Sequence, residues 1–179
     1  YALRQFFKKA AKETWFKNTV FVIVSDHCAS SSGKTELPMD KYRIPAMIYA
    51  PGFVPAQKYN TLMSQIDVMP TLFGLLNFSY ESKFYGEDVL KSDYKPRAFI
   101  ATYQDLGFIK DNVLTIISPV KQSKQFALKQ LDNPKLKEDF RIFYDETIMT
   151  TKRQDLIKES TAYYQTASDM LNKKKYDVK

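Results

Sequence analysis

Apolar and basic positions alternate with a helical period at the start of the chain, and they predict an amphipathic helix over residues 2–17. Residues 20–24 follow as an unbroken apolar, mostly β-branched run. Such a run is typical of a strand covered on both faces inside a parallel or mixed sheet. A second strand is predicted over residues 44–50, because prolines frame it and Pro51-Gly52 ends it. Helix, strand, loop and strand in this order indicate an α/β fold.

A short helix is predicted next, with caps supplied by Ser64 and Asp67. Pro70 fits only in the first turn of this helix, and Asn77 ends it. Asp67 is interpreted as a cap rather than as a catalytic base. The side expected to be buried consists of Val68, Met69, Leu72, Phe73, Leu75 and Leu76.

Short strands follow one another in the second half, at residues 98–103, 113–117 and 126–131. With Asp111-Asn112 as a turn, they predict an antiparallel meander. A long terminal helix is predicted over residues 147–172, covering one face of the meander.

Composition narrows the classes of partner. Lys and Arg number 27 against 20 Asp and Glu, a net charge of +7, but the lysines are scattered as on a solvated basic surface. No RNA-recognition motif or His/Cys finger accompanies the charge, so no nucleic-acid partner is expected. A single Cys excludes a disulfide framework, and the longest apolar run, residues 20–24, is too short to span a membrane.

Candidate chemistry lies at the end of the first strand, where Asp26 and His27 stand side by side. Ligands gather at the carboxyl ends of strands in open α/β sheets, and a carboxylate and an imidazole there can hold a divalent cation. For the pair alone, a loop-capping aspartate beside a partly exposed histidine is the preferred interpretation.

Three motifs that occur in a fixed order along the chain favour the metal-site interpretation. They are Ser-Asp-His after an apolar strand (25–27), Arg-x-Pro, an apolar strand and Pro-Gly (43–52), and Asp-x-x-Pro-Thr-Leu-x-x-Leu-Leu (67–76). This set resembles the C-terminal part of the sulfatase-fold family of the alkaline phosphatase superfamily, and is most similar to the lipoteichoic acid synthase-like phosphoglycerol transferases. The resemblance implies the C-terminal part of an alkaline-phosphatase-like mixed sheet with flanking helices, then a small antiparallel sheet and a long C-terminal helix. It further implies that residues 1–92 belong to the catalytic domain and residues 93–179 to a subdomain.

The resemblance also implies a metal site. Asp26 and His27 would be two of its ligands, with the remaining acid and the hydroxyl nucleophile upstream of Tyr1, so the chain alone is expected to be inactive. A single histidine favours one divalent ion over two. Mn²⁺ is favoured, with Mg²⁺, Zn²⁺ or Ca²⁺ open.

Secondary candidates lie in the loop after this pair. Lys34 is a candidate for a point charge on the substrate, although a solvated loop lysine also explains it, as it explains Lys41. Cys28, where many family members have Gly, is interpreted as a small turn residue outside the site. Arg43 is expected to tie the loop to the sheet.

The function implied is transfer or hydrolysis of phosphate or sulfate esters, with phosphoglycerol transfer from a membrane lipid preferred. A sulfatase and a non-catalytic module docking on anionic glycan or lipid are the alternatives. The expected partners are a phosphate- or sulfate-ester substrate and, through an upstream anchor, a membrane. The expected location is the extracytoplasmic face of a bacterial membrane or the periplasm.

Overall fold

The computed structural model describes residues 1–28, 37–120, 122–131 and 144–176. By their contacts the residues form two compact units, residues 1–28 with 44–60 (unit 1) and residues 29–43 with 61–179 (unit 2). These units divide the chain at other positions than residue 92. The boundary predicted there concerns domains and stays a prediction.

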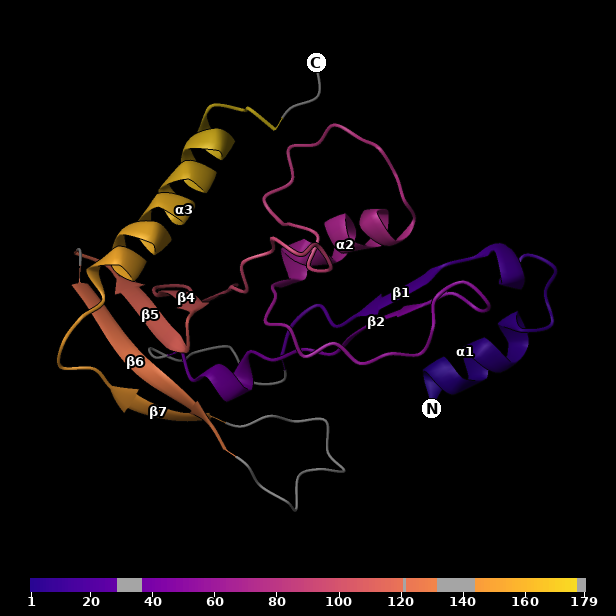
Figure 1. Cartoon of the computed structure of the whole chain (residues 1–179), viewed down its shortest axis with the longest axis horizontal. Helices are drawn as coiled ribbons and strands as arrows, with labels where there is room; N and C mark the ends of the chain where they lie inside the picture. Colours follow the sequence, from indigo (N-terminus) through magenta and orange to yellow (C-terminus); the bar gives the residue numbers. More distant parts are fainter. Residues whose placement is uncertain (29–36, 121, 132–143, 177–179) are drawn as a thin grey trace. The chain divides into compact units, whose positions relative to one another are not determined.

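Unit 1 consists of helix α1 (Ala2–Ala10), a 3-10 turn (Phe16–Asn18) and strands β1 (Phe21–Val24) and β2 (Ala46–Tyr49) (Figure 1). The helix ends earlier than the predicted residue 17. The amides after it donate to carbonyls three residues back, as in the bond from Lys12 to Lys9. This 3-10 type bonding turns the chain toward β1.

Strands β1 and β2 pair antiparallel, with Phe21 opposite Tyr49 and Val24 opposite Ala46. Phe7 of α1 packs edge-on against the Phe21 and Tyr49 rings at centroid distances of 5.1 and 5.3 Å. Strand β1 is half-buried and β2 is mostly exposed, so the described part of unit 1 does not provide the predicted cover on both faces.

Unit 2 contains a 3-10 turn (Met39–Lys41) and helix α2 (Val68–Leu75), which a second 3-10 turn (Gln65–Asp67) introduces. Ser64 and Asp67 form the predicted capping box. Asn77 ends the helix with a φ of 54°, a left-handed conformation that asparagine tolerates. Of the predicted buried side, Met69 is exposed instead.

The antiparallel meander is confirmed and is larger than predicted. Strands follow one another in the order β3-β4-β5-β6-β7. Their bounds are Ala98–Ala101, Leu106–Lys110, Val113–Ser118, Gln122–Gln130 and Tyr144–Ile148. Strands β4 and β7 were not predicted, and β7 occupies the start of the range predicted as helix.

Helix α3 (Gln154–Asn172) lies along the meander, as predicted (Figure 1). On the side of this helix, Leu156 packs with Phe108 and Val113. A second cluster contains Ile109 and Leu114. Each of them is the sequence neighbour of Phe108 or Val113, so their side chains lie on the opposite face of the sheet. Both faces of β4 and β5 are therefore covered. In the ranges that the structure describes, no helix has the length and hydropathy needed to cross a bilayer.

Candidate metal centre

Asp26 and His27 follow directly on β1, so the pairing of β1 with β2 positions them. The ladder extends one residue beyond the strand, because the Ser25 amide donates to the Pro45 carbonyl over 3.2 Å. The chain leaves the sheet at Asp26, as the sequence predicted.

The two side chains point toward each other. Oδ2 of Asp26 lies 3.4 Å from Nε2 of His27, and the side chains are 87% and 71% exposed. The His27 amide donates to Oδ1 of Asp26 over 3.0 Å. Nδ1 of His27 donates to the Cys28 carbonyl over 2.8 Å. With its proton on Nδ1, the ring presents the lone pair of Nε2 on the side of the carboxylate.

This geometry fits two ligands of one cation. Zinc–nitrogen and zinc–oxygen bonds of about 2.1 Å at tetrahedral angles place neighbouring ligand atoms about 3.4 Å apart. An exposed carboxylate oxygen and imidazole nitrogen at 3.4 Å can therefore approach one ion without rearrangement. Among the described residues, however, no cluster of three or more His, Cys, Asp or Glu could hold a metal ion. The pair is two ligands and not a complete shell.

The sequence also predicted further residues near this site. Lys34 lies outside the described residues. Lys41 is exposed, at the end of a 3-10 turn in unit 2. The Arg43 side chain is exposed, and most of the loop that it is expected to tie to the sheet lies outside the described residues, so this tie stays a prediction. Cys28 meets His27 through its carbonyl and not its thiol.

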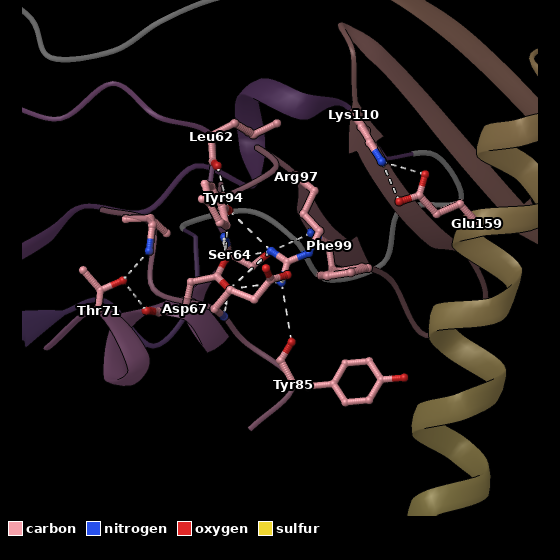
Figure 2. Close-up of polar contacts among 12 residues, drawn as sticks. Leu62, Ser64, Asp67, Thr71, Tyr85, Tyr94, Arg97, Phe99, Lys110 and Glu159 are labelled. Carbon is pink, nitrogen blue, oxygen red and sulfur yellow. Dashed lines mark hydrogen bonds and ion pairs between the residues drawn. The ribbon is translucent and has the colours of Figure 1, made fainter. Parts of the chain in front are cut away.

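A second polar cluster, inside unit 2, centres on Asp67 (Figure 2). The Asp67 carboxylate is fully buried and faces the guanidinium of Arg97, with Nη1 of Arg97 3.2 Å from Oδ2. The Asp67 carboxylate also accepts the amide hydrogens of Ser64 and Glu87, each over 2.8 Å. Asp67 is therefore a cap, as predicted, and also the centre of a buried ion pair that sequence reasoning missed.

Burial and neighbouring charges set the protonation of this cluster. Burial and the Asp67 carboxylate raise the pKa of Tyr94 to about 12, so its hydroxyl stays a donor. Burial opposes charge on Arg97, but Asp67, Tyr163, Tyr94 and Glu87 together outweigh it, and the pKa of Arg97 is raised. The guanidinium carbon also lies 5.3 Å from the Phe99 ring centroid. Most polar groups of the cluster bond to one another, and Nε of Arg97 is buried without a hydrogen-bond partner in the part of the chain that the structure describes. This arrangement suits a structural role.

Three comparisons with known proteins agree with these features. Residues 1–78 match the family model described as Sulfatase. Lipoteichoic acid synthase-like YvgJ of Bacillus subtilis (strain 168) is 32% identical over 117 residues, which is 55% of this chain and 19% of that protein. The chain thus spans about a fifth of the curated relative's length.

The crystal structure of a protein in the alkaline phosphatase superfamily from Vibrio parahaemolyticus matches all of this chain and 41% of its own, with a TM-score of 0.83 and 23% identity. This likeness shows the fold. The predicted α/β fold class is confirmed, with its small antiparallel sheet and C-terminal helix. The chain therefore has the fold of the alkaline phosphatase superfamily and resembles the sulfatase-fold family, including its lipoteichoic acid synthase-like proteins.

Proposed function

We propose that this chain supplies two metal ligands, Asp26 and His27, to an enzyme that transfers or hydrolyses phosphate or sulfate esters. The observation that carries the proposal is the 3.4 Å approach of Oδ2 of Asp26 to Nε2 of His27 on an exposed strand end. The match of residues 1–78 to the sulfatase model supports the same chemistry.

Each of the two residues has a defined task in this proposal. Asp26 contributes a charged oxygen, and the backbone amide of His27 holds its other oxygen in place. His27 contributes a neutral nitrogen, because its Nδ1–H bond to the Cys28 carbonyl fixes both the tautomer and the ring orientation. Asp26 and His27 would hold a divalent ion that would lower the pKa of a hydroxyl nucleophile and neutralise charge on the group in transfer. We propose one such ion, with Mn²⁺ favoured because carboxylate, imidazole and hydroxyl ligands suit it.

Phosphoglycerol transfer is the preferred reaction, because the relative at 32% identity is lipoteichoic acid synthase-like. Sulfate-ester hydrolysis is the second candidate, favoured by the family model over residues 1–78. The proposed substrate is correspondingly a lipid-linked phosphate ester or a sulfate ester. A membrane anchor outside this chain and an extracytoplasmic location belong to the same proposal, as does a point-charge contact from Lys34 to the substrate.

Substitution of the two ligands tests the proposal. In the protein at its full natural length, Asp26→Ala and His27→Ala should each weaken Mn²⁺ binding in calorimetry at least tenfold. Each should abolish turnover of both a phosphoglycerol lipid and an aryl sulfate. Cys28→Ser is the matched control, because only the backbone of Cys28 contacts His27, and it should retain both properties. Retained metal binding and turnover in both alanine variants would remove the assignment. Salt-sensitive binding to anionic vesicles without turnover would instead favour the docking module.

A further inference from the structure

Unit 2 contains a hollow that Asp26 and His27 do not line. Its volume is about 300 Å³, at the small end of ligand pockets. Pro70 and Gly74 of α2 form one part of its lining, and residues from the segment 78–94 form the rest. The proposed metal chemistry gives this hollow no role.

Aromatic side chains make up much of the lining. Phe78, Tyr80 and Phe84 all line the hollow and are each about half exposed. The Phe73 ring braces them, with centroid distances of 5.0 Å to Tyr80 and 5.9 Å to Phe84. Tyr80 and Phe84 also contact each other, at 5.9 Å. The faces of aromatic rings carry negative potential, so a group of rings around a hollow attracts cations.

The charged side chains of the lining also favour a cation. Glu87, Asp88 and Asp93 line the hollow against a single cation, Lys91, although the whole chain carries a net charge of +7. Glu87 is paired with Arg97, at 3.0 Å. Oδ1 of Asp88 accepts the Leu90 amide. Neither the Asp88 nor the Asp93 carboxylate forms an ion pair in the described part of the chain. The hollow therefore keeps uncompensated negative charge.

A small metal ion is a poor match for this hollow. Its three carboxylates are not among any group of acidic, His or Cys side chains close enough to hold a metal, as judged over the described ranges. Dispersed negative charge combined with aromatic walls is instead the arrangement that binds diffuse organic cations. We propose that the hollow lined by Phe78, Tyr80, Phe84, Asp88 and Asp93 binds a small organic ammonium group of the choline type.

Choline and its uncharged carbon analogue, 3,3-dimethylbutan-1-ol, provide the direct test. Saturation-transfer NMR titrations with the full-length protein should give millimolar binding of choline, and the alcohol should bind at least tenfold more weakly. Equal binding of the two molecules would overturn the proposal, because shape alone would then explain the affinity. Competition of choline by phosphatidylcholine vesicles, but not by phosphatidylglycerol vesicles, would identify a lipid headgroup as the source. Absence of competition would identify a free ammonium compound.

Variants locate the binding. Tyr80→Leu and Phe84→Leu should each raise the Kd for choline about two- to fivefold, the range expected for one partly exposed cation–π contact. Asp93→Asn should also raise it, whereas Lys91→Gln should lower it, because a competing cation is removed. Phe53→Leu, an exposed ring of unit 1 outside the hollow, is the matched control. Unchanged affinity in both ring variants would refute this location. Asp26→Ala should leave choline binding intact, so the two proposals fail separately.

Discussion

Asp67 is the residue whose loss should damage the fold most. Its carboxylate is 0% exposed and its partner Arg97 only 2% exposed, so neither charge is compensated by water. The backbone carbonyl of Asp67 accepts the Thr71 hydroxyl, and that hydroxyl in turn accepts the Val89 amide. One residue thus connects the start of α2, the segment after α2 and the start of β3.

Substitution of Asp67 by Asn keeps the shape of the side chain and removes its charge. The guanidinium of Arg97 then stays buried with only Glu87 as an ionic partner, and the free energy of unfolding should fall by about 3 kcal/mol. Urea denaturation followed by circular dichroism measures the loss. Asp169→Asn, which removes exposed pairs with Lys173 and Lys175, is the control and should show no measurable change. A similar loss in both variants would contradict the importance given to burial.

The sequence predicted half of this arrangement. The spacing of Ser64 and Asp67 before an apolar run indicated a capping box, which depends on neighbouring residues alone. Arg97 lies 30 residues further along the chain, and its pairing with Asp67 arises only when β3 is placed beside the start of α2. A carboxylate next to a buried helix requires a cation, but no local pattern identifies which one.

At the scale of elements, local turn chemistry explains which strands could be predicted. Asp111-Asn112 was recognised as a turn, and both residues adopt positive φ angles, 51° and 56°. Strand β4 was missed although it precedes this turn. Gly107 interrupts its apolar pattern. A larger residue does not fit at this position, because a Cβ there would approach Cγ1 of Ile100 to 2.6 Å. Strand β7 was missed because Asp145 and Glu146 give it the composition of a helix start.

The β4–β5 turn allows a test of how much the positive φ of Asn112 contributes to stability. Asn112→Ala should lower the free energy of unfolding by about 1 kcal/mol, because alanine tolerates a left-handed φ less well than asparagine. Asn112→Gly should be neutral or slightly stabilising, because glycine adopts this φ without strain. Thermal unfolding monitored by calorimetry compares the variants. If Gly destabilises as much as Ala, an interaction of the Asn112 side chain and not its φ would stabilise the turn.

At the scale of the whole molecule, the two units differ in how well their strands are covered. In unit 2, β4 and β5 have α3 on one side and the cluster around Ile109 and Leu114 on the other. In unit 1, β1 and β2 form a two-stranded sheet with half-buried and exposed positions. Isolated two-stranded sheets are marginally stable. The proposed metal ligands, Asp26 and His27, thus follow the sheet with less apolar cover.

Hydrogen exchange on the 179-residue chain should reveal this difference. Amides of β1 and β2 should exchange at least tenfold faster than those of β4 and β5, because opening a sheet with little apolar cover costs less free energy. Mass spectrometry of peptides from residues 21–24, 46–49 and 106–118 makes the comparison within one sample. Equal protection would mean that the apolar side chains of unit 1 have cover that the described residues do not supply. Faster exchange would mean that Asp26 and His27 need added order around β1 before they can hold an ion at a fixed position, because a metal site requires ligands held to within about 0.5 Å.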